Sequence, residues 1–374
     1  MRRRTFLASS LGLMTGVVGE GLTTMLCTRE ARAQATAAVA SPSMPPQGKW
    51  IRLAPLPQVQ GTSELLGVAV NGKIYAVQGQ LPGFKPAGLV YEYDPAGDAW
   101  TPKKPMPHPV HHAALTALDG KIYVFGGFEP PAAGPPGWNP VSNAWEYDPK
   151  TDGWRALAAM PTARGAGAVA VVGGKFYVIG GAGPIPGASD PTLRPRQPQR
   201  SLSTVEEYDP ATNTWRPRAP MPTACNHMGC EAVDGKIYII GGRLSGAFII
   251  GFPGNINLVQ AFDPASDGWT IKAPMPTARS GLNTASLNGI IYAAGGEVQD
   301  EKSLSAFRAF EAYHPVSDTW WALPSMLLPR HECIMAAVGN RVHVAGGSVQ
   351  SAIVPLPKGV SFETDAHEAF EVVS

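Results

Sequence analysis

A repeat of about fifty residues constrains this chain more than any other feature of its sequence. Tryptophan recurs at intervals of 50 to 61 residues, at Trp50, Trp100, Trp154, Trp215, Trp269 and Trp320. Such a period is typical of architectures in which one small unit is used several times and buries its apolar face against its neighbours. The chain is therefore expected to be a set of similar modules rather than several unrelated domains.

Each repeat contains a two-residue turn signal between two apolar runs. The turn pairs are Asn71-Gly72, Asp119-Gly120, Gly173-Gly174, Asp234-Gly235, Asn288-Gly289 and Gly339-Asn340. Such residues adopt a positive φ at low cost, so the pairs predict tight β-hairpins. Each hairpin ends in a diglycine, as at Gly126-Gly127, with Gln78-Gly79 as a degenerate first copy.

A third and a fourth strand are expected after each hairpin. The third carries an aromatic residue before Asp-Pro, as in Tyr93-Asp94-Pro95, and the tryptophan opens the fourth. Proline cannot donate a hydrogen bond within a sheet, so it marks the turn between these strands. The 42 glycines and 37 prolines also fit many short strands joined by tight turns better than long helices.

The succession of Gly-Gly, Tyr-Asp-Pro and Trp resembles the kelch repeat over nearly all of residues 50–374. The resemblance implies an all-β fold, a six-bladed kelch β-propeller with one four-stranded blade per repeat. The sixth repeat lacks a fourth strand, whereas a lone strand, residues 49–53, precedes the first repeat. We expect this N-terminal strand to pair with residues 367–374 and close the ring.

The first 33 residues are expected to be a signal peptide, followed by a linker at 34–48 and the propeller at 49–374. Arg2, Arg3 and Arg4 precede an apolar stretch, and Ala31-Arg32-Ala33 is a small-x-small cleavage site. Residues 3–7 resemble the twin-arginine pattern, and general secretion is the alternative. The mature protein is therefore expected to be periplasmic or secreted, without membrane attachment.

Charge argues against a nucleic-acid partner. Without residues 1–33, 25 Lys and Arg residues stand against 27 Asp and Glu residues. Nucleic-acid binding needs a concentrated basic surface, which this balance does not indicate.

Binding chemistry is expected in the loops that the resemblance places around the channel mouth: the loops that enter each blade and those between its second and third strands. Aligning the entering loops on Met-Pro gives a first layer of Gln60, Val110, Arg164, Cys225, Arg279 and Arg330. The second layer is Gly61, His111, Gly165, Asn226, Ser280 and His331. The third layer is Thr62, His112, Ala166, His227, Gly281 and Glu332.

Arg164, Arg279 and Arg330 come from three blades and could hold one anionic ligand, since guanidinium groups match carboxylates in a bidentate way. Arginine at this position is also part of the family's ordinary repeat, where it caps or bridges blades. Both roles are open from sequence.

The histidines His111, His112, His227 and His331 raise the question of a metal. Their spacing is not diagnostic, and alternation along a strand predicts that adjacent His111 and His112 point to opposite faces. Galactose oxidase also contains kelch units, but its copper ligands have no matching motif here. No metal and no cofactor are therefore predicted.

The second set of loops supplies two further candidates, Arg243 and Glu297, which directly follow diglycines on neighbouring blades. They are expected to form either a structural ion pair or an acid/base pair. The loop 243–256 is apolar for a surface, with Phe248, Ile249, Ile250 and Phe252. It is expected either to contact a partner or to fold down over the ring.

Two functions are consistent with this sequence. The first is a binding protein that recognises a protein, peptide or carbohydrate at the channel-mouth loops. The second is a sugar-acid enzyme similar to the periplasmic kelch epimerases of N-acetylneuraminate, in which the three arginines hold a carboxylate and Glu297, Glu332 or a histidine moves a proton. Familiar catalytic motifs such as Gly-x-Ser-x-Gly do not occur, so no catalytic residue is assigned.

Overall fold

The computed structural model describes residues 44–57, 63–81, 85–195, 197–248, 254–299, 304–351 and 362–373. In these ranges the regular structure is all β, with six four-stranded antiparallel sheets and three two-stranded ribbons. None of the described residues forms a helix long and apolar enough to cross a membrane.

Each four-stranded sheet is one blade. The first three are β2 (Ser63–Val70), β3 (Lys73–Leu81), β4 (Lys85–Asp94), β5 (Ala99–Pro102); β6 (Ala114–Leu118), β7 (Lys121–Phe125), β10 (Ala144–Asp148), β11 (Gly153–Ala156); and β12 (Ala168–Val172), β13 (Lys175–Ile179), β16 (Val205–Asp209), β17 (Thr214–Arg218). The last three are β18 (Gly229–Val233), β19 (Lys236–Ile240), β20 (Val259–Asp263), β21 (Gly268–Lys272); β22 (Asn283–Leu287), β23 (Ile290–Ala294), β26 (Phe310–His314), β27 (Thr319–Ala322); and β28 (Ile334–Val338), β29 (Arg341–Ala345), β30 (His367–Val373), β1 (Gln47–Leu53).

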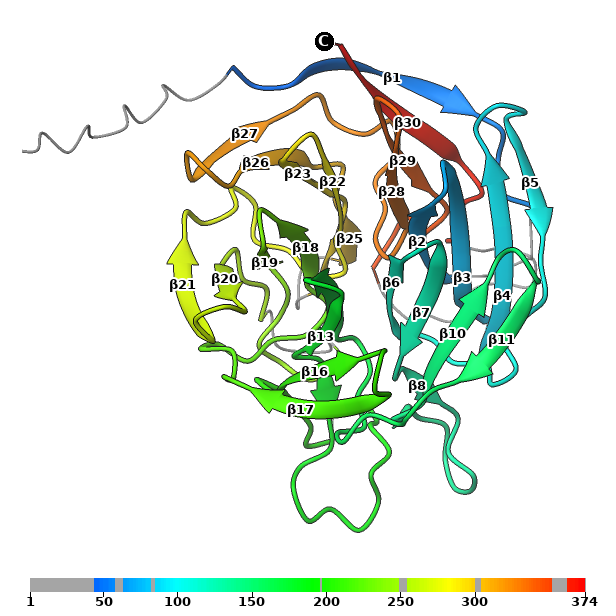
Figure 1. Ribbon diagram of the computed structural model, residues 1–374, viewed down its shortest axis with the longest axis vertical. Helices are drawn as coiled ribbons and strands as arrows, with labels where there is room; N and C mark the ends of the chain where they lie inside the picture. The colour runs from blue at the N-terminus through cyan, green and yellow to red at the C-terminus, as the bar shows by residue number, and fades with distance from the viewer. Residues whose placement is uncertain are drawn as a thin grey trace, which may run out of the picture. The chain divides into compact units, whose positions relative to one another are not determined.

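The innermost strands of the six blades stand side by side around a central axis (Figure 1). β2 contacts β6, and the contacts continue through β12, β18, β22 and β28 back to β2. The predicted six-bladed β-propeller is confirmed.

The ring is closed by the two ends of the repeat region. β1 runs antiparallel to β30, with Gln47 opposite Val373 and Leu53 opposite His367. Trp50 lies opposite Phe370, and their rings meet edge to face with centroids 5.5 Å apart. The predicted closure is confirmed, and the N-terminal strand begins at Gln47, two residues before the predicted start.

A repeated hydrogen-bonded joint links neighbouring blades. Trp154 Nε1 donates to the carbonyl of Lys104 at 3.1 Å, and the Lys104 amide donates to Asp152 Oδ1 at 2.9 Å. Asp152 Oδ1 also accepts from the Tyr147 hydroxyl at 2.6 Å. The same indole bond recurs from Trp50 to Pro324, Trp100 to Ala54, Trp215 to Ala158, Trp269 to Ala219 and Trp320 to Ala273. The repeated Tyr and Trp residues therefore tie the blades together.

The diglycines allow the backbones of neighbouring blades to approach closely. Gly126 has a φ of +66°, and a Cβ there would lie 2.3 Å from the carbonyl O of Arg164 in the next blade. Only glycine fits such a position without moving the backbone. This close contact fixes the position of the chain segment that enters the next blade, and so positions the loops around the axis.

Beyond some diglycines the chain forms short ribbons. They are β8 (Phe128–Glu129) with β9 (Asn139–Pro140), β14 (Ala182–Gly183) with β15 (Arg200–Ser201), and β24 (Glu297–Gln299) with β25 (Leu304–Ala306). Their first residues pair with the entering loops, as Phe128 does with His111 and Glu297 with Ser280. The two sets of loops expected around the channel mouth are thus hydrogen-bonded to each other.

Candidate functional site at the channel mouth

One residue per blade takes a left-handed backbone conformation at one end of the channel. We call these six residues the axial ring: Glu64, His112, Ala166, His227, Gly281 and Glu332, with φ between 50° and 61°. Backbone hydrogen bonds of 2.8 to 3.0 Å link successive members from His112 to Glu332. A positive φ is uncommon outside glycine and is concentrated at functional sites, where the surrounding structure maintains it.

The blade 1 member, Glu64, differs from the residue expected from sequence. The alignment on Met-Pro put Thr62 at this position and Gln60 two residues earlier. Ser63 pairs with Gln80, the residue after the degenerate diglycine, and Glu64 follows it. The entering loop of blade 1 is therefore two residues longer than the alignment assumed, and Gln60 lies outside the described residues.

A different reference point in the sequence finds all six ring members. Each lies eight residues before the second residue of a hairpin turn, as Glu64 does before Gly72 and His112 before Gly120. The inner hairpin keeps a constant length because its residues pair across the turn, whereas entering loops tolerate insertions. The hairpin turn was the signal that could have identified Glu64.

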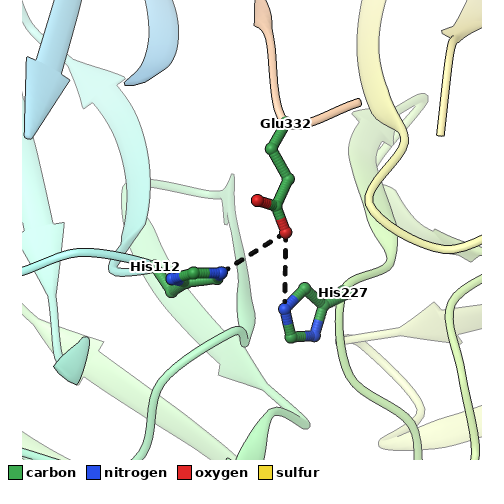
Figure 2. Close-up of side chains that lie close together, drawn as sticks. All are labelled: His112, His227 and Glu332. Atoms are coloured by element: carbon green, nitrogen blue, oxygen red, sulfur yellow. Dashed lines mark ion pairs between the residues drawn. The ribbon is translucent and has the colours of Figure 1, made fainter. Parts of the chain in front are cut away.

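Four side chains of the axial ring converge on the axis, three of them drawn in Figure 2. His112 Nε2 and His227 Nε2 lie 3.3 and 3.5 Å from the same oxygen, Glu332 Oε1. Glu64 Oε2 lies 3.0 Å from His112 Nε2. None of these four side chains is more than 10% exposed.

His111 and His112 do not point to opposite faces, so that prediction is wrong. Their Nδ1 atoms lie 2.6 Å apart, and both residues are buried. His112 has a φ of 55°, and the alternation of side chains holds only for extended backbone. His111 packs against Trp138, with ring centroids 5.0 Å apart. Burial, and then the neighbouring His112, lower the pKa of His111 well below its usual value.

Arg243 connects the axial ring to the neighbouring blade. Its Nη1 lies 2.6 Å from Glu297 Oε1, and both side chains are less than one-tenth exposed. Its Nη2 lies 2.9 Å from His227 Nε2 and also donates to the carbonyl of Ala247. The ion pair considered from sequence is therefore present, in direct contact with a ring histidine.

His227 is oriented by the residue before it. Its Nδ1 lies 2.5 Å from Asn226 Oδ1. An amide oxygen only accepts hydrogen bonds, so the proton is on Nδ1 and the lone pair of Nε2 faces the axis. Burial, and then the charge of Arg243, lower the pKa of His227 well below its usual value, which keeps this imidazole neutral.

Glu297 extends the cluster to blade 6. Its Oε2 accepts a hydrogen bond from the Ser351 hydroxyl at 2.7 Å and lies 3.6 Å from His331 Nε2. Ser351 was not predicted, because the loop between the second and third strands differs in length from blade to blade. We use the name axial site for the axial ring together with Arg243, Glu297 and His331.

The two ring carboxyl groups have opposite pKa shifts. Burial, and then the charge of Glu332, raise the pKa of Glu64 well above its usual value. Burial also acts on Glu332, but the neighbouring His112 and a hydrogen bond from Glu64 outweigh it and lower the pKa of Glu332. Glu64 is thus the protonated partner and Glu332 the ionised one.

The three arginines expected to share an anion do not meet at the axis. Each guanidinium pairs inside its own blade, Arg164 with Glu206, Arg279 with Glu311 and Arg330 with Glu368. Each also donates to backbone carbonyls of that blade. Of the two roles left open from sequence, the structure shows the one within the blade, because a fully buried guanidinium needs a partner and the blade's own glutamate supplies it.

Comparison with known proteins agrees with the architecture. Four copies of the Kelch motif match residues 109–161, 163–222, 224–276 and 278–327, more than half of the chain. The chain belongs to the kelch-repeat family. The blades before and after the matched copies carry the same joints, through Trp100 and Trp50.

Several kelch proteins are similar to this one. It is 28% identical over 330 residues to "Kelch-like protein terF" of Aspergillus terreus, covering 85% of this chain and 69% of the fungal one. It is 28% identical over 256 residues to "Kelch-like protein 35" of Mus musculus, covering 68% and 38%. It is 26% identical over 286 residues to "Beta-scruin" of Limulus polyphemus, covering 74% and 29%. The chain thus spans less than half the length of the two animal relatives.

An aromatic cluster borders the axial ring of this kelch propeller. Trp138 stacks on Phe248 and Phe128, with centroids 4.1 and 5.2 Å apart, and lies 4.7 Å from the His112 ring. Phe248 is 7% exposed, so this part of the apolar loop folds down over the ring. The rest of its large apolar residues, Ile249, Ile250 and Phe252, lie outside the described residues.

The channel of the kelch propeller continues past the axial ring as a cavity of about 370 Å³. All six innermost strands line it, and Gly167 and Met228, which follow ring members, are part of its wall. Glu231 also lines this cavity, and desolvation raises its pKa to about 7 against the hydrogen bonds of Ser286 and Thr284. The axial site therefore stands at the entrance to a partly polar channel.

Proposed function

We propose that the mature kelch propeller is an exported binding protein whose ligand brings a positively charged group into the channel mouth. The observation that carries this proposal is the charge of the axial site. Glu64, Glu297 and Glu332 supply three carboxyl groups, and the one arginine among the described residues that pairs with any of them is Arg243, on Glu297. Elsewhere in the blades the buried charges are paired, as in Arg164 with Glu206.

This imbalance makes a positive ligand group favourable. Arg243 pairs with Glu297, whereas Glu332 faces the imidazoles of His112 and His227 and, among the described residues, has no ion pair with a lysine or arginine. A buried carboxylate without a full partner is costly, because it has lost its hydration. A cationic group entering the mouth would supply the missing charge and stabilise the folded protein by an amount that rises with the logarithm of its concentration above Kd.

The negative charge of the axial site also distinguishes between the two functions considered from sequence. A sugar-acid enzyme needs Arg164, Arg279 and Arg330 to hold a carboxylate, and each of these is already engaged by a glutamate. An acidic mouth repels that substrate class. We therefore retain the binding protein and favour a partner with basic groups, such as a basic segment of a protein or peptide, over a neutral or acidic carbohydrate.

Export is supported by the sequence of residues 1–33, which lie outside the described residues. Arg3-Arg4 followed by an apolar stretch and Ala31-Arg32-Ala33 is the pattern expected for a cleaved leader. The proposed site of action is thus the periplasm or the extracellular space, where basic peptides and metal ions are accessible.

The test is a set of thermal unfolding and calorimetric titrations of residues 34–374 with probes of opposite charge. Tetralysine, spermidine and divalent cations form the positive set, and tetraglutamate and N-acetylneuraminate the negative set. We expect at least one positive probe to raise Tm and to lose this effect in Glu332→Gln. Glu371→Gln, which removes a carboxylate on β30, is the matched control and should keep the effect. Stabilisation by the negative set alone, or none by either set, would contradict the proposal.

A further inference from the structure

We infer that the positively charged group is a divalent transition-metal ion, held on the propeller axis by His112, His227 and Glu332, with Glu64 beside them. The inference rests on the proposed function and names its ligand class. The sequence predicted no metal, because the spacing of these residues along the chain matches no known motif. The fold brings them together from blades 1, 2, 4 and 6.

The separations between the donor atoms suit a shared ion. Four ligands at about 2.0–2.2 Å from Zn²⁺ in a tetrahedron lie about 3.3–3.6 Å from one another. Glu332 Oε1 lies 3.3 Å from His112 Nε2 and 3.5 Å from His227 Nε2, and the three donors are all within 4.8 Å of each other. Glu64 Oε2 lies 3.0 Å from His112 Nε2, beside these three donors.

One buried nitrogen at the centre of this group, His112 Nε2, makes no well-aligned hydrogen bond. His112 is 6% exposed, and its Nε2 makes no well-oriented hydrogen bond although it points at the Glu332 carboxylate (Figure 2). Its other nitrogen, Nδ1, contacts His111. Buried polar atoms are almost always paired, so an imidazole nitrogen that has two carboxyl groups within 3.3 Å but no well-aligned hydrogen bond to either is suited to bind an ion between them.

The backbone places these side chains at one level around the axis. His112, His227, Glu332 and the adjacent Glu64 each have a positive φ, between 50° and 60°. The remaining ring members are Ala166 and Gly281, which bring no bulky side chain to the axis. Ala166 and Gly281 share this conformation, so it belongs to the repeat and directs one residue of each blade toward the axis.

Among the described residues, Arg243 is the group that competes with an ion for His227 Nε2. Its Nη2 contacts His227 Nε2 at 2.9 Å, so the ion would replace this contact. The guanidinium keeps its other partners in that case, since Nη1 bonds Glu297 and Nη2 donates to the carbonyl of Ala247. Asn226 holds the far side of His227, the arrangement by which metal-binding imidazoles are commonly oriented.

The donor set selects the class of ion. Imidazole nitrogen suits Zn²⁺ and its transition-metal neighbours, whereas Ca²⁺ and Mg²⁺ prefer oxygen ligands alone. Two imidazoles with one carboxylate therefore favour Zn²⁺, and Co²⁺ as its spectroscopic substitute, over the alkaline-earth ions.

The experiment is a titration of metal-free mature protein, residues 34–374, with Co²⁺ followed by Zn²⁺. We expect visible cobalt absorption that saturates at one equivalent and is displaced by Zn²⁺. His112→Gln removes a direct ligand and should lower the affinity for Co²⁺. The loss should exceed the 10- to 100-fold that follows when only a residue hydrogen-bonded to a ligand is removed. His314→Gln, at a turn where the histidine contacts Ser317, is the matched control and should bind as wild type. Glu332→Gln provides a second, nearly isosteric variant, and circular dichroism without metal establishes that each variant folds.

Two results would overturn the inference. One is the absence of saturable cobalt absorption in the wild-type protein. The other is metal binding that is equal in wild type, His112→Gln and Glu332→Gln. If tetralysine or spermidine still binds in either case, the proposed function stands and only the metal is wrong. If no cation of any kind binds, both fail.

Discussion

Trp50 Nε1 donates a hydrogen bond of 2.8 Å to the carbonyl of Pro324, 274 residues away in the chain. Five further tryptophans make the same bond to the preceding blade, but Trp50 makes it from the strand that closes the ring. Its ring also packs on Phe310 and Phe370, with centroids 4.8 and 5.5 Å away. The closure therefore uses the same joint as every other pair of blades.

Removing this closure should destabilise the whole propeller. We expect Trp50→Ala to lower the free energy of unfolding by about 3 kcal/mol, because it removes a large packed ring and an indole bond. Deletion of residues 44–53 should cost more, since β30 then becomes an exposed edge. Deletion of 44–46 alone, outside β1, is the control. Urea unfolding that is unchanged by the longer deletion would contradict the closed ring.

The in-blade arginines should matter for stability and not for binding. Arg164→Met leaves Glu206 buried without its partner and should cost about 3–5 kcal/mol. The double variant Arg164→Met with Glu206→Leu should recover most of this loss, because both charges are then gone. Urea unfolding of the three proteins measures the coupling. A single variant that keeps wild-type stability but loses ligand binding would restore the anion-site hypothesis.

Acid should lower the free energy of unfolding, because two buried histidines lie close together on β29 and β30. His343 Nδ1 lies 3.1 Å from His367 Nε2, and burial lowers their pKa values to about 3 and about 4. The unfolded chain binds these protons near pH 6.5, so stability is constant above that pH and falls as the pH decreases toward the folded values.

The slope from each histidine is about 1.4 kcal/mol per pH unit over that window. Asp98 opposes both shifts, whereas Arg341 adds to that of His343 and Arg330 to that of His367. We expect His343→Phe to reduce the slope between pH 6.5 and 5 by this amount, as measured by urea unfolding at each pH. An unchanged slope would show that His343 is charged in the folded protein.

Export by the twin-arginine route depends on the paired arginines. Arg3→Lys with Arg4→Lys keeps the basic charge of the leader and should abolish export by that route. Fractionation of cells with an antibody to the mature protein gives the readout, and N-terminal sequencing of the exported form should start after Ala33. Unchanged export of the double variant would indicate general secretion instead.

The fold could be predicted from sequence because each sequence signal for it is local and is repeated six times. Turn pairs such as Asn71-Gly72, the diglycines and the Trp joints each constrain a short segment, and their order implies four strands per blade. The closure followed from one missing strand and one spare strand. Such features do not depend on knowing the lengths of the loops.

The site was harder to predict because it depends on loop lengths and on backbone conformation. Two additional residues before Glu64 shifted the alignment of blade 1 and hid this carboxyl group. The positive φ of His112 invalidated the assumption of alternating side chains. The partners of Arg164, such as Glu206, lie 42 residues away and are found only after the blade has folded.

The most direct test of a cation at the axial site is anomalous diffraction from crystals of the mature protein grown with Zn²⁺, with data collected on both sides of the zinc edge. The account predicts one strong peak on the propeller axis, about 2.0–2.2 Å from His112 Nε2, His227 Nε2 and the Glu332 carboxylate. A map without a peak at this position, or with zinc only at a surface site or beside His343 and His367, would contradict it.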